Sequence, residues 1–211
     1  MTDISLDRQI FWNERSGLGL AAGSGDTNLK ALEIKAIHKE IGHANTILDA
    51  GCGNAHTLVE LSTLHPESKF FGFDYSGGMI GAAKQLTKER GVSEQIRLCQ
   101  GNLMDLPSEE LAALGVPANG LDCVYTERSL INLDTLDQQV SSIQALWNLV
   151  ASGGSLVLCE AFLDGLHEIN YFRQSVNLPA IQPPWHNRYF SVSELIDLLP
   201  DALGGGQIRE F

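Results

Sequence analysis

One stretch of the chain indicates the fold: Thr46-Ile47-Leu48-Asp49-Ala50-Gly51-Cys52-Gly53-Asn54-Ala55-His56. Its apolar start, residues 47–50, is typical of a buried parallel strand. Two glycines follow, and behind them apolar residues recur at the spacing of a helix. A strand, a glycine turn and a helix in this order open a nucleotide-binding α/β unit. We expect Gly51 and Gly53 to let a ligand lie against the backbone, because neither has a Cβ atom.

The glycine turn differs from the dinucleotide-binding fingerprint in two ways. His56 stands where that fingerprint has its third glycine, and Asp49 ends the strand, where it would repel a pyrophosphate. A carboxylate beside the glycines suits a ligand with a cationic group, such as the ammonium of an amino acid. The motif therefore points away from NAD, and a turn with two purely structural glycines stays open as an alternative.

Residues 48–53 resemble the first motif of class I S-adenosylmethionine-dependent methyltransferases, an acid followed by Gly-x-Gly. The resemblance implies a Rossmann-like, doubly wound and mostly parallel sheet. It also implies S-adenosylmethionine as the cofactor and S-adenosylhomocysteine as the product. Asp49, Gly51, Cys52 and Gly53 would then bind the cofactor.

Composition narrows the choice of partners. A length of 211 residues with 44% hydrophobic content predicts a single domain, residues 1–211. The net charge of −12 argues against nucleic acid, because a phosphate backbone would be repelled. We expect no membrane partner and a cytoplasmic location, because the start of the chain lacks an apolar signal region and no apolar run is long enough to span a bilayer. The cysteines form no Cys-x-x-Cys pair, which favours buried, reduced thiols.

Later strands add further candidate residues. A second strand, residues 69–74, ends in Asp74, which follows Gly53 by 21 positions (74 − 53) and so has the spacing of an acid that binds ribose hydroxyls. By the resemblance, Tyr75 and Met79 would lie beside the cofactor, with Met79 on the adenine, although Met79 also suits the core. Asn102 and Leu103, after a third strand at residues 96–100, are the candidates for the adenine amino group.

A fourth strand, residues 121–125, runs into Thr126 and Glu127, which by the resemblance would contact the amino group of the cofactor or a hydroxyl of the acceptor. A solvated charged loop is the alternative. We expect a helix over residues 135–150 and a fifth strand over residues 155–160. Residues 207–211 are candidates for a sixth strand, after which no sequence remains for the family's last antiparallel strand.

Two flanking segments complete the predicted site. By the resemblance, residues 9–25 would form a lid, with Trp12 covering the cofactor and Arg15 pairing with its carboxylate; plain packing is the alternative. Residues 161–190 would form an insertion that shapes the acceptor site, because its proline-rich part gathers aromatic and hydrogen-bonding groups. Three stretches, residues 11–19, 127–132 and 184–189, also resemble a bacterial subgroup found with polysaccharide-biosynthesis proteins.

The sequence predicts methyl transfer to a small polar acceptor, an oxygen of a sugar-like or other hydroxyl-bearing metabolite. An oxygen acceptor needs a base. His186 is the first candidate, Glu127 the second and His167 a poorer one, each against the alternative of an ordinary surface residue. We expect no metal, and a monomer or homodimer. Two alternatives stay open: an inactive S-adenosylmethionine-binding protein and a nicotinamide-dependent oxidoreductase.

Overall fold

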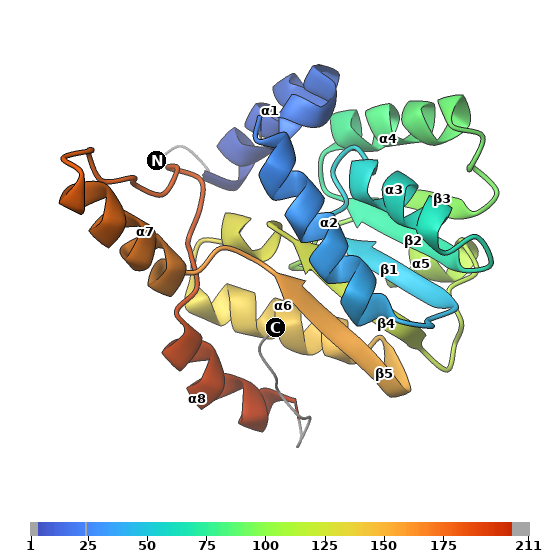
Figure 1. The fold of residues 1–211 in the computed structure, drawn as a ribbon. Coiled ribbons are helices and arrows are strands. Elements are labelled where there is room, and N and C mark those ends of the chain that lie inside the picture. The colour runs from blue at the N-terminus through green and yellow to red at the C-terminus, as the bar shows by residue number, and fades with distance from the viewer. Residues whose placement is uncertain (1–3, 24, 204–211) are drawn as a thin grey trace.

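The computed structural model describes residues 4–23 and 25–203. Its centre is a five-stranded sheet in the order β3-β2-β1-β4-β5, in which all neighbouring strands are parallel. Figure 1 shows helices on both faces of the sheet, so the predicted doubly wound, Rossmann-like class is confirmed. The strands are β1 (Thr46–Ala50), β2 (Lys69–Asp74), β3 (Ile96–Gln100), β4 (Leu121–Glu127) and β5 (Val150–Cys159).

The helices form two layers and an N-terminal cover. One layer packs on the first face of the sheet and contains α2 (Thr27–Ile41), α3 (His56–Leu64) and α4 (Gly77–Glu89). The other contains α5 (Ser108–Ala113) and α6 (Leu136–Trp147), with α8 (Val192–Ala202) against α6. The remaining elements are α1 (Ile4–Arg15), which contacts α4, the 3₁₀ helices η1 (Ser16–Ala22) and η2 (Leu130–Asn132), and α7 (Leu163–Ser175).

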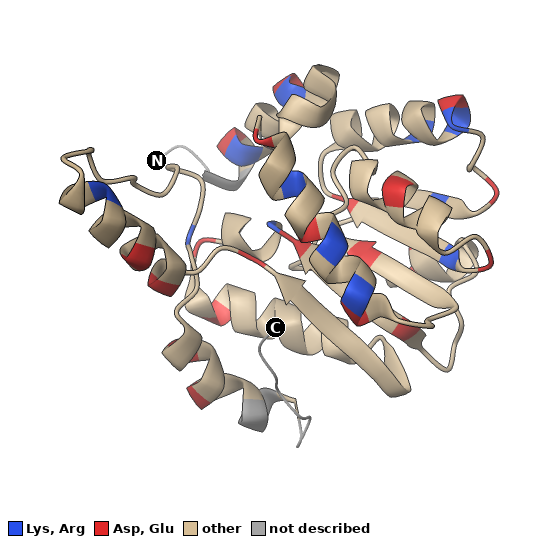
Figure 2. Ribbon diagram, in the orientation of Figure 1, with Lys and Arg blue, Asp and Glu red and all other residues tan. Residues whose placement is uncertain are grey.

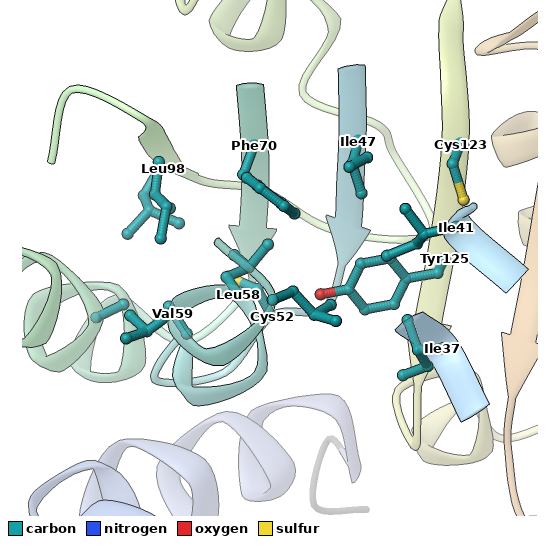
Figure 3. Packing of buried hydrophobic residues seen from close by; sticks show 14 of the residues in the cluster. Ile37, Ile41, Ile47, Cys52, Leu58, Val59, Phe70, Leu98, Cys123 and Tyr125 are labelled. Atoms are coloured by element: carbon teal, nitrogen blue, oxygen red, sulfur yellow. The ribbon is translucent and has the colours of Figure 1, made fainter. Parts of the chain in front are cut away.

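The core follows from the alternation of side chains along each strand. Ile47 packs into the cluster under α2 and α3, whereas its neighbour Leu48 packs into the cluster under α5 and α6. Both side chains are fully buried, as the predicted parallel strand requires. Figure 3 shows Tyr125 of β4 in the first cluster, between Ile37 and Cys52, with its hydroxyl pointing toward Cys52. On this face of the sheet, the Tyr125 side chain therefore places its hydroxyl beside the glycine turn.

Several helix ends are fixed by local hydrogen bonds or by a glycine. The carboxylate of Asp26 accepts hydrogen bonds from the first turn of α2, and the hydroxyl of Ser76 accepts one from Met79 at the start of α4. Gly42 ends α2 with a φ of 58°, a value that glycine adopts without steric cost. Each of these end signals depends on residues within about one helical turn.

Residues 4–22 are mainly helical. One expectation is wrong in detail. The helix expected to reach residue 150 ends at Trp147, because Val150 pairs with Leu121 and starts β5 five residues early, with a register shift before Ser155. The first half of the segment 161–190 contains the helix α7. All prolines of the segment follow this helix, so only the second half of the segment is irregular. The candidate sixth strand at 207–211 lies outside the described residues.

The order of the strands places the site. The chain runs from β1 outward to β2 and β3 and then returns to β4 on the other side of β1. The connections therefore diverge between the carboxyl ends of β1 and β4, where open α/β sheets bind their ligands.

Figure 2 shows the basic residues spread over several helices and interspersed with acidic ones. Within the described part of the chain, no helix is both long and apolar enough to cross a bilayer.

Candidate cofactor and acceptor site

A cavity of about 650 Å³ lies at the carboxyl ends of β1, β2 and β4, under α1 and η1. It brings together every candidate residue predicted from the sequence except Thr126 and the poorer base candidate His167. The Thr126 side chain is fully buried and does not line the cavity, so the geometry does not support a direct contact to a ligand. The candidates that line it are Trp12, Arg15, Asp49, Gly51, Cys52, Gly53, Asp74, Tyr75, Met79, Asn102, Leu103, Glu127 and His186.

The two glycines of the turn have different tasks. A Cβ atom on Gly51, which has a φ of 91°, would lie 2.3 Å from the Cβ of Ser129. Gly51 is therefore needed for the approach of the β4 loop, whose Ser129 hydroxyl donates to the carbonyl of Ala50 at 2.7 Å. A Cβ atom on Gly53, with a φ of 52°, would meet nothing within 4 Å. Gly53 is thus the glycine at which a ligand can lie against the backbone.

Asp74 is held rigidly at the end of β2. Its two oxygens accept from the backbone N–H groups of Gly53 at 2.9 Å and Ser76 at 2.8 Å. Burial raises the pKa of Asp74 to about 6, although both N–H groups act in the opposite direction. Each carboxylate oxygen keeps a second lone pair, so Asp74 can still accept hydrogen bonds from two hydroxyls. This arrangement fits the predicted ribose contact.

Asp49 is the buried acid of the turn. The Tyr125 hydroxyl donates to its Oδ2 at 2.9 Å, whereas Oδ1 has no hydrogen-bond partner among the described residues. Burial raises the pKa of Asp49 well above its usual range, and the charge of Glu127 adds to this. A cationic group in the cavity would favour the ionised carboxylate and supply the missing partner. The donor set therefore fits a ligand with an ammonium or sulfonium group.

Glu127 is already paired inside the protein. Lys30 of α2 lies 2.8 Å from both of its carboxylate oxygens, and the Thr57 hydroxyl donates to Oε2 at 2.6 Å. Despite its burial, these partners, Lys30 foremost, lower the pKa of Glu127. A carboxylate with a lowered pKa is a weak base near neutral pH. Glu127 is therefore better suited to holding Lys30 at the cavity wall than to removing a proton.

The adenine candidates follow the carboxyl ends of β2 and β3. Met79 is buried at 3% exposure, so it serves the core as well as the cavity wall. The Asn102 side-chain oxygen accepts from the backbone of Met104 at 3.0 Å, which turns it into its own loop. The carbonyl of Tyr75 accepts from Gln9 at 3.1 Å and from Gln100 at 3.0 Å. The roles of these residues toward adenine stay predictions.

The N-terminal segment lines one side of the cavity. Arg8 forms an ion pair with Asp134, which follows η2, and Asn13 accepts from the Ser76 hydroxyl at 2.6 Å. Helix α1 therefore joins two loops on opposite sides of the cavity. Arg15 donates to the carbonyls of Ala21 and Ala22, at 2.7 Å each. Arg15 thus stabilises the chain after α1, and fewer of its donors are left for the predicted cofactor carboxylate.

The loop before α8 brings His186 to the same cavity. The N–H of Arg188 donates to the carbonyl of Ile131 at 2.7 Å, and Gln139 donates to the carbonyls of Leu130 and Arg188. The ring of His186 lies 4.6 Å from that of Phe11 and lines the cavity. Trp185, in contrast, is 62% exposed. Of the predicted aromatic loop, His186 thus lines the cavity, whereas most of Trp185 is exposed.

The chemistry of His186 suits a base. Its Nδ1 is buried and has no hydrogen-bond partner in the described part of the chain. Burial lowers the pKa of His186, and the nearby charges of Arg8 and Arg15 lower it further. The imidazole is therefore neutral near pH 7 and can accept a proton. His167, the poorer candidate, is exposed on α7 and does not line the cavity.

Glu160 was missed by the sequence analysis, which used it only to mark the end of a strand. It lines the cavity and accepts from the backbone N–H groups of Ser129, Leu130 and Ile131, at 3.2, 3.0 and 3.3 Å. Burial raises the pKa of Glu160 to about 7. Its position at the carboxyl end of a strand was the available signal. Arg8, Lys30 and Asn132, which also line the cavity, carry no comparable signal in the sequence.

Comparison with known proteins agrees with this arrangement. A family model described as a methyltransferase domain matches residues 41–177, more than half of the chain. Demethylmenaquinone methyltransferase of Geobacillus stearothermophilus is 29% identical over 129 residues, which cover 59% of this chain and 50% of the relative. O-methyltransferase rstn1 of Aspergillus nomiae is 25% identical over 118 residues, which cover 56% of this chain and 47% of the relative. The chain spans half or less of the length of these relatives.

Solved structures show the same fold. An O-methyltransferase family protein from Burkholderia thailandensis aligns with a TM-score of 0.61 at 18% identity, covering 82% of this chain and 50% of that one. Magnesium protoporphyrin IX methyltransferase from Synechocystis, solved with bound S-adenosylhomocysteine, gives a TM-score of 0.58 at 17% identity, over 82% of this chain and 72% of that one. The five-strand order, the glycine turn with its two acids and the family match lead to one conclusion. This chain belongs to the methyltransferase domain family and contains a class I S-adenosylmethionine-dependent methyltransferase domain.

Proposed function

We propose that the chain transfers the methyl group of S-adenosylmethionine to a hydroxyl oxygen of a small polar acceptor, such as a sugar-like metabolite. One observation carries the proposal: a single cavity contains the cofactor motif, Asp49 to Asp74, and the unpaired imidazole nitrogen of His186. The O-methyltransferase among the relatives supports an oxygen acceptor. The net charge of −12 disfavours a polyanionic acceptor.

The residues divide the work between binding and proton removal. S-adenosylmethionine, when bound, supplies a sulfonium methyl group that a nucleophile can displace. Asp74 would hold the ribose hydroxyls, and Asp49, ionised by the cation, would hold the amino group. His186 would accept the proton of the acceptor hydroxyl as the new oxygen–carbon bond forms. Positioning of the two reactants contributes up to about 7–11 kcal/mol in well-oriented systems.

His186 is the better of the two predicted bases. Its pKa is lowered and its Nδ1 is unpaired, so it is a free acceptor near neutral pH. Glu127 has two tight partners, Lys30 and Thr57, and would have to leave them to act. We assign Glu127 the role of a positioning residue that fixes Lys30 beside Asp49, with His186 as the base.

Residues 9–25 would act as a lid over the cavity, together with the start of α1. Its contacts reach three different loops: Gln9 bonds to Tyr75, Asn54 bonds to Gly19 at 2.7 Å, and Arg8 pairs with Asp134. Trp12 lines the cavity from above and packs edge-on against His186, with ring centres 5.5 Å apart. The segment 161–190 would shape the acceptor end of the cavity through its residues 184–189.

Two measurements test the proposal. Calorimetric titration should show binding of S-adenosylhomocysteine and none of NAD; the reverse result would favour the nicotinamide alternative. Transfer of a labelled methyl group from S-adenosylmethionine should then be measured against panels of sugars, phenols and hydroxy acids. Cofactor binding without methyl transfer to any of them would support the alternative of an inactive binding protein.

A further inference from the structure

We propose that the methyl acceptor carries one negatively charged oxygen beside its reacting hydroxyl, and that Arg8 binds this oxygen. The inference rests on the proposed function and narrows its substrate class. It starts from three buried polar atoms at the acceptor end of the cavity that have no hydrogen-bond partner among the described residues. They are Nε of Arg8, Oδ1 of Asn132 and Nδ1 of His186.

Arg8 is the buried cation of this group. It is 8% exposed and lines the cavity, and its side-chain partner in the described part of the chain is Asp134, at Nη1. A buried guanidinium with an unmade hydrogen bond is costly, since the lost hydration is not replaced. Its planar donors match a carboxylate in a two-point contact, which lysine cannot provide. Arg8 therefore has an unsatisfied buried donor, and its planar donors suit an anionic partner.

Asn132 and His186 suggest the rest of the acceptor. The Asn132 side-chain nitrogen donates to the carbonyls of Arg128 and Ser129, at 2.9 and 3.3 Å. These bonds fix the amide so that Oδ1 is left as an acceptor. His186, when neutral, can also accept at Nδ1. One donor on a cation beside two acceptors complements a molecule that has an anionic oxygen and hydroxyl groups.

Two positive charges act at His186 in this part of the cavity. The positive charges that act on His186 are those of Arg8 and Arg15, and together with burial they lower its pKa. Arg15 has committed two donors to backbone carbonyls, whereas Arg8 has committed one atom to Asp134. The whole chain, however, has a net charge of −12. This net charge would repel a polyanion more strongly than a monoanion, so the proposal is limited to a single negative charge.

Two chemical sources can supply such an oxygen: a carboxylate, as in a uronic acid or a hydroxybenzoate, and an ionised phenol. The walls formed by Phe11 and Trp12 accept the face of a sugar ring as well as an aromatic ring. Binding should be measured by calorimetry on protein saturated with S-adenosylhomocysteine. The probes are 3-hydroxybenzoate against 3-hydroxybenzyl alcohol, glucuronate against glucose, and 4-nitrophenol below and above its own pKa.

We expect the charged member of at least one pair to bind about tenfold or more tightly, the strength of a hydrogen bond to a charged group. A preference in the carboxylate pairs identifies a carboxylate, and a preference confined to ionised 4-nitrophenol identifies a phenolate. Equal binding of charged and neutral probes in every pair would overturn the inference. S-adenosylhomocysteine binding in the same samples tests the proposed function separately, so the two failures are distinguishable.

Variants separate anion binding from a structural role of the ion pair. Arg8→Gln should abolish the preference for the charged probe, whereas the matched control Arg97→Gln, outside the cavity, should keep it. Asp134→Asn removes the competing carboxylate and should tighten binding of the charged probe. If the ion pair between Arg8 and Asp134 were purely structural, the opposite would be expected. Its loss would then loosen α1 and weaken the binding of all probes. Should Arg8→Gln fail to fold, the Asp134→Asn result alone decides: weaker binding of the charged probe overturns the proposal.

Discussion

The two halves of the cavity are built in different ways. In the cofactor half, Asp49, Gly53 and Asp74 stand at the ends of adjacent strands, and backbone N–H groups hold both oxygens of Asp74. In the acceptor half, Arg8, Asn132 and His186 come from α1, η2 and the loop before α8, and each has a buried polar atom without a partner among the described residues. In the cofactor half, Oδ1 of Asp49 is the atom in that state, whereas Asp74 is fully held by the backbone. The acceptor half therefore depends more on its ligand, and we expect the specificity of this chain to lie there.

The largest expected effect concerns the base of the acceptor half. His186→Ala should lower turnover by about 10²–10⁴-fold, the usual contribution of a general base, and leave affinity for S-adenosylhomocysteine unchanged. In the unaltered protein the rate should fall only at acidic pH, because the pKa of His186 is lowered. Steady-state kinetics against pH would show both effects.

The matched control for this prediction is His167→Ala, since His167 is exposed and outside the cavity. It should retain full turnover. Full turnover in His186→Ala as well would remove His186 as the base and return the role to Glu127. Weaker cofactor binding in His186→Ala would mean that the two halves of the cavity are not separable.

The next effect concerns the cofactor half. Asp74→Ala should weaken S-adenosylhomocysteine binding by about 1.5–3 kcal/mol, the range for hydrogen bonds to a charged group. Calorimetry near pH 8, where Asp74 is ionised, measures this directly. The exposed Asp105, outside the cavity, supplies the control Asp105→Ala, which should bind normally. An unchanged affinity in a folded Asp74→Ala variant would exclude Asp74 from the cofactor site.

The smallest effect is on stability and compares the buried acids of the two halves. Burial raises the pKa of Glu160 to about 7, so the folded state holds its proton more tightly than the unfolded state does. This contribution is fully present below the unfolded pKa, about 4.3, and is lost as the pH rises through about 7. The free energy of unfolding should therefore fall by on the order of 1 kcal/mol or more over this range. Asp74, with a pKa of about 6, should act likewise over a narrower window.

Thermal unfolding across this pH range would measure the effect. Glu160→Gln should flatten the pH dependence, because an amide does not titrate. Glu109→Gln, an exposed substitution in α5, should leave it unchanged. A melting temperature that rises steadily from pH 5 to pH 8 would contradict the raised pKa of Glu160.

Local signals let the sequence predict which residues meet at the glycine turn. Asp49, Gly53 and Asp74 lie within 26 residues of each other, and their strand–turn–helix context is set by patterns a few residues long. The tasks of the two glycines were less visible. That Gly51 makes room for Ser129 depends on a residue 78 positions further along (129 − 51), which no local pattern indicates.

By itself, then, the sequence determined the doubly wound fold class, the glycine turn and the two acids beside it, because apolar runs and glycine turns are short-range properties. Only the tertiary structure decided that Lys30 neutralises Glu127, that Arg8 reaches Asp134 across the cavity and that His186 faces inward while Trp185 faces solvent. The physical reason is that these contacts join residues up to 126 positions apart. Their formation depends on how whole helices and loops pack over the sheet, and that packing leaves no periodic trace in the sequence.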